Sequence, residues 1–328
     1  MTPMQLAVRL LILVLSIGAF VGLVHWRALA REAAALEENP PRGQIIEVDG
    51  VDVHVVTMGS GPDLILLHGA GGNINDFTFA LAPRLAERYR VIVFDRPGLG
   101  WTGRIPGAHG KLWDTRAESP LEQAGFLQKA ADQIGVKRPI VLGQSFGGAV
   151  AFAWALSDPD TAAVVSVAGV ANPWPGQLSR LYRVNGSLAG GALVVPMLTA
   201  FAPQSLVEDT LASIFHPQPA PDGYLDHVGP GLSLRRETIR ANARQVLSLR
   251  PHVVEMSERY HELDLPVEIV HGSADTIVPL NVHSITLPDQ IEGANLTVLD
   301  GVGHMPHHTH MEDVIAAVDR AATRAGLR

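Results

Sequence analysis

The feature that most constrains the fold of this chain is the segment GQSFGG at residues 143–148. The apolar run RPIVLGQ precedes its serine, and the helix-like run AVAFAWAL follows its last glycine. A sharp turn from a strand into a helix excludes side chains at Gly143 and Gly147, which would collide with neighbouring backbone. Such a turn exposes the hydroxyl between them, and the N-terminus of the following helix favours negative charge there. The pattern predicts that Ser145 is a nucleophile rather than a small residue in an ordinary tight turn.

Short apolar runs alternate with longer helical patterns along most of the chain after residue 43. Most of the later runs are continuous in Val, Ile and Leu, as expected for strands buried on both faces of a parallel sheet. The alternation predicts an α/β fold, a mostly parallel doubly wound sheet of about eight strands with helices on both faces. The predicted strands are Ile45–Val48, Val51–Thr57, Asp63–His68, Arg90–Phe94, Pro139–Gly143, Ala163–Val167, Val267–His271 and Leu296–Leu299, and the clearest predicted helices are Phe79–Arg88, Leu121–Gln133, Ala149–Leu156 and Asp313–Arg324.

The alternation stops in the middle of the chain. Several prolines, the apolar segment GSLAGGALVVPMLTAF and a long helical pattern from Ser233 to Leu249 replace the strands there. The length of this stretch favours a separate helical cap over an ordinary pair of extra helices at the sheet edge. The predicted domains are a core at residues 44–172 and 262–328 and a helical cap at residues 173–261.

The N-terminus carries the apolar run LLILVLSIGAFVGLV at Leu10–Val24. Counted from Met4, the stretch approaches the ~20 residues needed to span a bilayer, although Gln5 and Arg9 interrupt it. The run therefore predicts an N-terminal hydrophobic helix, either a single membrane helix or the apolar part of a signal peptide.

The residues that follow this run are compatible with a retained membrane helix and with a cleaved signal peptide. Trp26 and Arg27 suit an anchor at the level of the lipid headgroups, whereas Ala28–Ala30 resembles a small-residue cleavage site. The prediction favours an uncleaved membrane anchor at residues 1–30, followed by a helical stalk and linker at residues 31–43. The alternatives are a cleaved signal, which makes the protein secreted or periplasmic, and a buried N-terminal helix of the domain. Basic residues flank the run on both sides, so the side of the membrane stays open.

The composition excludes several classes of protein. The 328 residues carry a formal net charge of -8, so no basic face for a nucleic acid is expected. Cysteine is absent, which excludes disulfides, Cys-ligated zinc and a thiol nucleophile. At 47% hydrophobic and 18% charged residues, the chain is typical of a core-rich globular protein.

Two downstream residues are suited to activate Ser145. Asp275 follows the predicted strand Val267–His271, and His304 follows the predicted strand Leu296–Leu299. Because the carboxyl ends of parallel strands meet at one edge of a sheet, the three side chains are expected to converge there. In the predicted catalytic triad, His304 accepts the proton of Ser145 and Asp275 orients the imidazole.

Two other acids compete for the third position of this triad. Asp264 precedes its strand, at the wrong end of the sheet, and Asp300 lies so close in sequence to the predicted base that a turn residue is the better interpretation. The expected oxyanion donors are the amides of Phe146, directly after the serine, and of Ala70, in the loop HGAGG after the third strand. Gly71 is the alternative donor in that loop.

Five motifs together carry a resemblance: HGAGG (68–72), DRPGLG (95–100), GQSFGG (143–148), HGSADTIVP (271–279) and GVGHMPHH (301–308). With them the chain resembles the α/β-hydrolase superfamily, in the cap-bearing branch that includes esterases, carbon–carbon bond hydrolases, epoxide hydrolases and haloalkane dehalogenases. The resemblance covers the core segments and not the cap. Epoxide hydrolases and dehalogenases of this branch have Asp at the nucleophile position, so Ser145 implies acyl chemistry instead.

The resemblance implies a serine hydrolase that works without a cofactor through an acyl-enzyme. The apolar cap segment and the anchor favour a small apolar acyl substrate, with an ester or thioester as the first choice. The alternatives are carbon–carbon bond hydrolysis of a ring-cleavage product, acyl transfer to an alcohol, and a non-catalytic binding protein on the same fold. The expected pocket residues are Gly71, Trp174, Met197 and Phe201; for the apolar cap residues, a place in the cap core or in a patch that touches the membrane is the alternative.

Two further patterns suggest ligands that we do not predict. The segment GLGWTG at residues 98–103 matches the dinucleotide-binding pattern in form, but no clear helix opens after it. The histidines His304, His307, His308 and His310 suggest a metal, yet their spacing lacks a helical zinc pair such as H-E-x-x-H, so no metal site is predicted. His307 and His308 are expected near the surface, where the last helical region begins.

Overall fold

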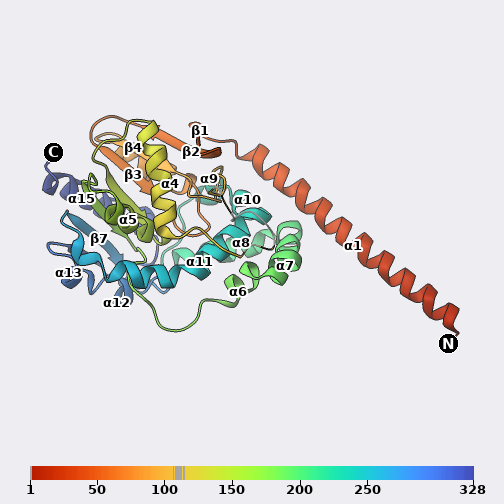
Figure 1. Ribbon diagram of the computed structural model, residues 1–328. Coiled ribbons are helices and arrows are strands. Elements are labelled where there is room, and N and C mark those ends of the chain that lie inside the picture. Colours follow the sequence, from red (N-terminus) through yellow and green to blue (C-terminus); the bar gives the residue numbers. More distant parts are fainter. Residues whose placement is uncertain (1, 106, 108–112, 114) are drawn as a thin grey trace.

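The fold is built on a β-sheet with helices packed around it (Figure 1). The computed structural model describes residues 2–105, 107, 113 and 115–328. Among these residues it has eight strands in the order β1-β2-β4-β3-β5-β6-β7-β8. The pairs β1–β2 and β2–β4 are antiparallel and the other pairs are parallel, which confirms the predicted mostly parallel α/β fold. The strands are β1 (Gln44–Val48), β2 (Val51–Met58), β3 (Asp63–Leu67), β4 (Arg90–Phe94), β5 (Ile140–Gln144), β6 (Ala163–Val167), β7 (Val267–Gly272) and β8 (Asn295–Leu299).

Helices cover both faces of this sheet. The helices of the core are α2 (Asn75–Thr78), α3 (Leu81–Leu85), α4 (Pro120–Gln133), α5 (Phe146–Ser157), α12 (Leu280–His283), α13 (Leu287–Gln290), α14 (Pro306–Thr309) and α15 (Met311–Arg324). Alternate residues of a strand point to opposite faces. In β3, Ile65 and Leu67 pack in one cluster with α4 and α5, whereas Leu64 and Leu66 pack in another with α3 and α15. Burial on both faces explains why the central strands are continuous apolar runs.

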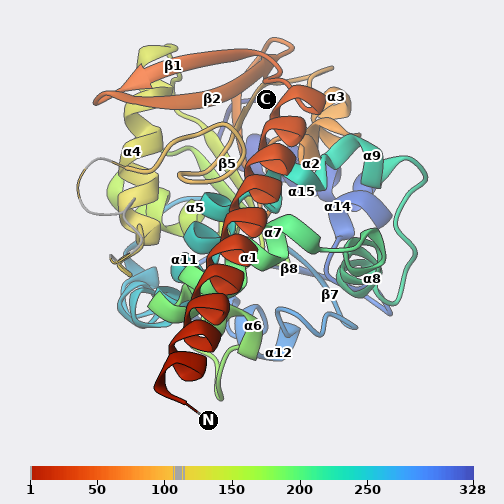
Figure 2. The same cartoon turned by 90° about the vertical axis from the view of Figure 1, so that its right-hand side faces the viewer.

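A helical region, called the cap below, lies between β6 and β7, over the edge where the parallel strands end (Figures 1 and 2). Its elements are α6 (Arg180–Gly186), α7 (Leu188–Phe201), α8 (Gln204–Phe215), α9 (Tyr224–Val228), α10 (Pro230–Ser233), α11 (Arg236–Ser257) and the 3-10 turn Tyr260–Glu262. The helix predicted over Ser233–Leu249 begins later and ends later than expected. Pro251 removes one amide donor from α11, but Val253 and Met256 beyond it are buried and hold the helix against the core.

The N-terminal helix α1 (Pro3–Glu38) projects from the body of the protein in Figure 1, and the residues of its first half are exposed. It is long and apolar enough to cross a membrane. Its buried residues are Val24, Ala28 and Ala35, and Ala28 packs against Ala200 of α7. The helix continues through residues 31–38 without a break, and Glu32 within it forms an ion pair with Arg236 of α11 at 2.7 Å.

Candidate active site

Ser145 occupies a strained turn between β5 and α5. Its φ of 53° and ψ of -120° lie in a region that residues other than glycine rarely adopt. The turn is held because the Ser145 amide donates to Val167 O at 3.1 Å, and Ser145 O accepts from the amides of Gly148 and Val170. Strain that the surrounding structure maintains in this way is typical of functional sites.

The glycines beside this serine are required by close backbone approaches. A Cβ at Gly143 would lie 2.1 Å from Gly147 O, and a Cβ at Gly147 would lie 2.0 Å from Leu67 O. Neither position has room for any side chain. The turn therefore has the geometry that the sequence pattern predicts for a nucleophile, with β3 and β5 packed directly behind it.

Asp275 and His304 lie in the loops after β7 and β8, and the structure brings them together. Nδ1 of His304 is 2.7 Å from Oδ2 of Asp275, and both side chains are buried. The other oxygen, Oδ1, accepts from the amides of Ile277 and Val278 at 2.8 and 2.9 Å. The carboxylate is thus fixed on one side by backbone and presents its other oxygen to the imidazole.

The charge of Asp275 is stabilised although the group is buried. Burial alone would raise its pKa, but hydrogen bonds with His271 and His304 and the nearby amides outweigh that effect and hold the pKa well below its ordinary value. Asp275 is therefore ionised throughout the neutral range, as an acid that stabilises an imidazolium must be.

The side chain of Gln144, next to Ser145 in the chain, lies against His304. Nε2 of Gln144, the residue before Ser145, lies 3.3 Å from Nε2 and 3.3 Å from the carbonyl oxygen of His304. The turn that carries Ser145, called the elbow below, and the loop that carries His304 therefore lie at one edge of the sheet. Within the described residues, no hydrogen bond joins Ser145 to His304; catalytic hydrogen bonds are often long in a protein without substrate and tighten when substrate binds.

The loop at residues 68–72 packs against this elbow. A Cβ at Gly69 would lie 3.1 Å from the Cβ of Ser145, so the loop backbone passes close to the serine. Phe146 is the first residue of α5, and the first amides of a helix have no partner within it. The amides of Phe146 and Ala70 are thus on the two segments that adjoin Ser145, as an oxyanion hole requires.

Arg96 determines how this loop is oriented, and the sequence did not single it out. Its guanidinium donates to His68 O at 2.8 Å and Gly69 O at 2.9 Å, and it lies over the Phe146 ring, 4.3 Å from the centroid. Gly69 O also accepts from Nδ1 of His68. The peptide unit is planar and trans, so holding Gly69 O on one side directs the Ala70 amide to the other.

Burial makes Arg96 an unusual cation. Desolvation lowers its pKa to about 9, although Glu118 and Asp95 oppose that effect. Gln123 accepts from the guanidinium at 2.8 Å. The DRPGLG motif that contains Arg96 was the available signal, but only the folded chain shows which carbonyls the side chain reaches.

A second buried cluster corrects one expectation. His307 and His308 were expected near the surface, but both side chains are buried beside Asp76 of α2. Nε2 of His308 lies 2.8 Å from Asp76 Oδ1, Nε2 of His307 lies 3.2 Å from Oδ2, and the Tyr224 hydroxyl donates to Oδ1 at 2.7 Å. The partner acid is far away in sequence, so neighbouring residues could not reveal this burial.

This cluster offers metal-ligating atoms, one from each of Asp76, His307 and His308, within 4.8 Å of one another. Nδ1 of each histidine has no hydrogen-bond partner among the described residues. Asp76, the two histidines and Tyr224 also form a hydrogen-bonded network, which ties α9 to α14.

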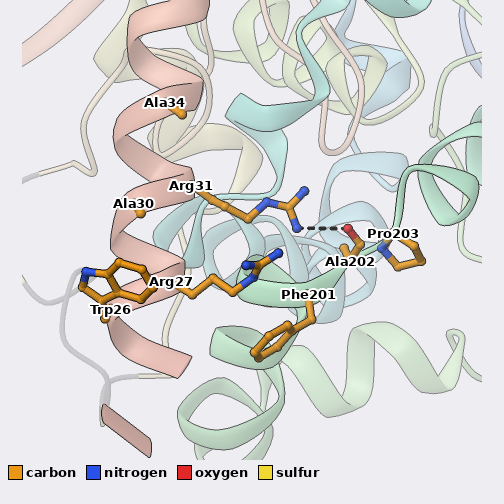
Figure 3. A pocket seen from close by; sticks show the side chains of 8 residues that line it. All are labelled: Trp26, Arg27, Ala30, Arg31, Ala34, Phe201, Ala202 and Pro203. Atoms are coloured by element: carbon orange, nitrogen blue, oxygen red, sulfur yellow. Dashed lines mark hydrogen bonds between the residues drawn. The ribbon is translucent and has the colours of Figure 1, made fainter. Parts of the chain in front are cut away.

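The four expected pocket residues lie in different places. Gly71 is at the junction of core and cap, where its carbonyl accepts from Ser233 Oγ at 2.6 Å. Trp174 is half-buried, with its ring 5.9 Å from that of His283. Met197 and Phe201 are on the outer face of α7, 37% and 40% exposed. Phe201 faces α1 instead of a closed cap interior (Figure 3).

Comparison with known proteins agrees with the fold. The model of the alpha/beta hydrolase fold family matches residues 62–311, so the chain belongs to that family. It is 26% identical over 306 residues to a 2-hydroxymuconate semialdehyde hydrolase of Pseudomonas sp. (strain CF600), a match that covers 88% of this chain and 99% of the relative. It is 27% identical over 288 residues to a pimeloyl-[acyl-carrier protein] methyl ester esterase of Aeromonas hydrophila, covering 82% and 98%.

Among solved structures, a bacterial membrane phospholipase A superposes with a TM-score of 0.65 at 19% identity, covering 98% of this chain and 100% of that one. At this identity the likeness concerns the fold alone. The family and its relatives place the chain among the hydrolases, and they include both ester and carbon–carbon bond hydrolases.

Proposed function

We propose that this protein is a membrane-anchored serine hydrolase that cleaves an ester or other acyl bond of a hydrophobic small molecule. The observation that carries the proposal is the buried Asp275–His304 pair, set at the same sheet edge as Ser145 in its strained turn. A nucleophile, a base and an acid that orients the base are the parts that acyl transfer needs.

The reaction follows from the positions of these groups. Ser145 Oγ attacks the carbonyl carbon while Nε2 of His304 takes its proton, and Asp275 stabilises the imidazolium through Nδ1. The amides of Phe146 and Ala70 stabilise the oxyanion. His304 then protonates the leaving alcohol, and the acyl group remains on Ser145. A water molecule deprotonated by His304 releases the acid and restores the enzyme.

The packing of α1 supports an anchor that is retained. Cleavage after Ala30 would remove Val24 and Ala28 from the interface with α7, together with the hydrogen bond from Arg27 Nε to Ala200 O at 2.8 Å. A membrane helix that is part of the folded protein places the active site close to lipid. This arrangement favours an apolar acyl substrate.

One observation favours a second candidate, carbon–carbon bond hydrolysis. The 2-hydroxymuconate semialdehyde hydrolase matches this chain over 99% of its own length. The same triad geometry would serve that reaction, since both begin at a carbonyl carbon. The two candidates differ in the bond that breaks and are separated by substrate choice.

The test is turnover of p-nitrophenyl esters of graded acyl length by the full chain in detergent micelles, beside the Ser145→Ala variant. We expect turnover that depends on acyl length and is lost in the variant. Turnover retained by Ser145→Ala would contradict the proposed nucleophile. Activity on a vinylogous diketone but on no ester would establish the second candidate instead.

A further inference from the structure

We propose that the outer face of α7 lies in the headgroup region of an anionic lipid leaflet, the one at which α1 leaves the membrane. The cap would thus make a second contact with the bilayer, in addition to the anchor. The inference rests on the membrane span of α1 that the proposed function includes. The name "α7 face" is used below for Leu193, Val194, Met197 and Phe201.

The α7 face is apolar where a surface helix is normally polar. Residues at these spacings share one side of a helix, and they are 69%, 37%, 37% and 40% exposed in chain order. The opposite side, with Val195 and Thr199, is buried. Within α7, which the structure describes in full, the one polar side chain is Thr199, and it is buried with its hydroxyl donating to Leu234 O. A helix that is apolar on its outer face as well needs an apolar partner there.

The position of this face relative to α1 indicates what the partner is. A membrane helix needs ~20 residues to cross the hydrocarbon region, so a span that begins near Met4 ends near Val24. Val24 and Ala28 are the residues of α1 that pack with Ala200. The C-terminal end of α7 therefore lies level with the point at which α1 leaves the bilayer, and Figure 1 shows α6 and α7 on the side of the cap nearest the free part of α1.

Side chains at this level are those that favour a lipid headgroup region. Trp26 is 66% exposed beside Arg27, and the Arg27 guanidinium lies 5.3 Å from the centroid of the Phe201 ring. A groove of about 490 Å³ between α1 and the C-terminal end of α7 is lined by these side chains and by Arg31 (Figure 3). Tryptophan and arginine are enriched where acyl chains meet headgroups.

Charge favours an anionic leaflet. From Pro173 to Val207 the sequence contains Arg180 and Arg183 and no Asp or Glu. Both arginines are exposed on α6, the helix directly before α7. Each arginine guanidinium has several N–H donors, and Arg27 and Arg31 each use part of theirs on carbonyls at the end of α7. A basic, apolar segment of this kind is attracted to anionic lipids.

The test exploits the absence of cysteine in the chain. Spin labels are attached to Leu193→Cys on the α7 face, to Leu15→Cys in the proposed span and to Asp132→Cys on the exposed surface of α4, each in the full chain. The three proteins are reconstituted in vesicles of phosphatidylcholine with phosphatidylglycerol. Oxygen, which partitions into lipid, and a water-soluble nickel chelate then report the surroundings of each label.

We expect the label at position 15 to be reached by oxygen and shielded from nickel, the label at position 132 to be reached by nickel, and the label at position 193 to have oxygen and nickel access between those two. A label at 193 that nickel reaches as readily as the label at 132, with the label at 15 in lipid, would overturn the inference and leave the anchor intact. Shielding of 193 from both reagents would indicate contact with a second copy and would also overturn it. Nickel access at both 193 and 15 would contradict the membrane anchor itself.

A functional readout separates lipid contact from catalysis. Leu193→Glu places a charge on the α7 face without changing a buried side chain. We expect a several-fold loss of turnover on an ester dissolved in anionic vesicles and unchanged turnover of p-nitrophenyl butyrate in detergent. Equal losses in both assays would contradict the inference, whereas no turnover by the unmodified protein in either would contradict the proposed function.

Discussion

At the scale of single residues, the site depends on unreactive glycines and backbone amides as much as on reactive groups. Ser145 adopts its exposed turn only because Gly143 and Gly147 leave space that any side chain would fill. Asp275 keeps its charge in a buried place only because amides and imidazoles surround it. Neither the glycines nor the amides react, yet the proposed chemistry depends on them.

The first prediction concerns Gly147. Gly147→Ala places a Cβ 2.0 Å from Leu67 O, so we expect the elbow to shift, esterase activity to be lost and the free energy of unfolding to fall by about 1–3 kcal/mol. Gly125→Ala on α4 is the matched control, because its nearest neighbour is 4.0 Å away. Denaturant unfolding and ester turnover measure both variants, and equal behaviour of the two would refute the packing argument.

The second prediction separates the two acids near His304. Asp275→Asn keeps the shape but removes the charge that holds Nδ1, so we expect kcat to fall by about 10³- to 10⁴-fold. Asp300→Asn changes a surface residue that accepts from Ser273 Oγ at 3.1 Å, and its kcat should match the unmodified protein. The reverse result, with Asp300 essential and Asp275 dispensable, would reassign the acid. Steady-state kinetics on one ester are sufficient.

At the scale of elements, loops from different strands hold one another in place. The loop after β4 carries Arg96, which holds the carbonyls of His68 and Gly69 in the loop after β3. The short helix α14 after His304 is tied to α2 and to the cap helix α9 through Asp76. The strands determine where each loop begins, and these buried contacts determine how each loop points.

The third prediction tests whether Arg96 positions the loop at residues 68–72. Arg96→Lys keeps a positive charge but loses the planar fork that reaches both carbonyls. We expect the Ala70 amide to be misplaced and kcat to fall by up to about 100-fold, with a smaller change in KM. Arg259→Lys is the control, since its pair with Glu262 is about half exposed on both sides and contributes little. A change confined to KM would indicate a role in binding instead.

At the scale of the whole molecule, the fold buries titratable groups that it must keep neutral or paired. Burial lowers the pKa values of His68, His283 and His307 to about 4. These residues belong to the loop after β3, to α12 and to α14, so acid acts on several parts of the core at once. A change of pH is therefore expected to alter the free energy of unfolding of the whole protein.

The fourth prediction is the direction of that response. Between pH 6.5 and pH 4 the unfolded chain binds protons at His68, His283 and His307 that the folded protein does not, so stability is lost as the pH falls. Each histidine contributes up to about 1.4 kcal/mol per pH unit. Denaturant unfolding at pH 7.5, 6 and 5 measures the slope, and His307→Gln should reduce it. Stability that is flat or rises toward pH 5 would contradict the assigned burial effects.

The sequence alone determined the order of the strands along the chain, the α/β class and the positions of Ser145, Asp275 and His304 relative to strand ends. These follow from local patterns of apolar residues and from glycines in tight turns, which neighbouring residues specify. Short motifs predicted the chemistry for the same reason.

The tertiary structure alone decided which distant groups meet. Arg96 reaches Gly69 across 27 positions, and Asp76 meets His308 across 232, distances at which local periodicity carries no information. It also decided which side of α7 is exposed, because a helix that is apolar all round shows no preferred face until α1 and Leu234 cover one of them. Contacts between segments that are remote in sequence depend on how whole elements pack, and packing is a property of the folded chain.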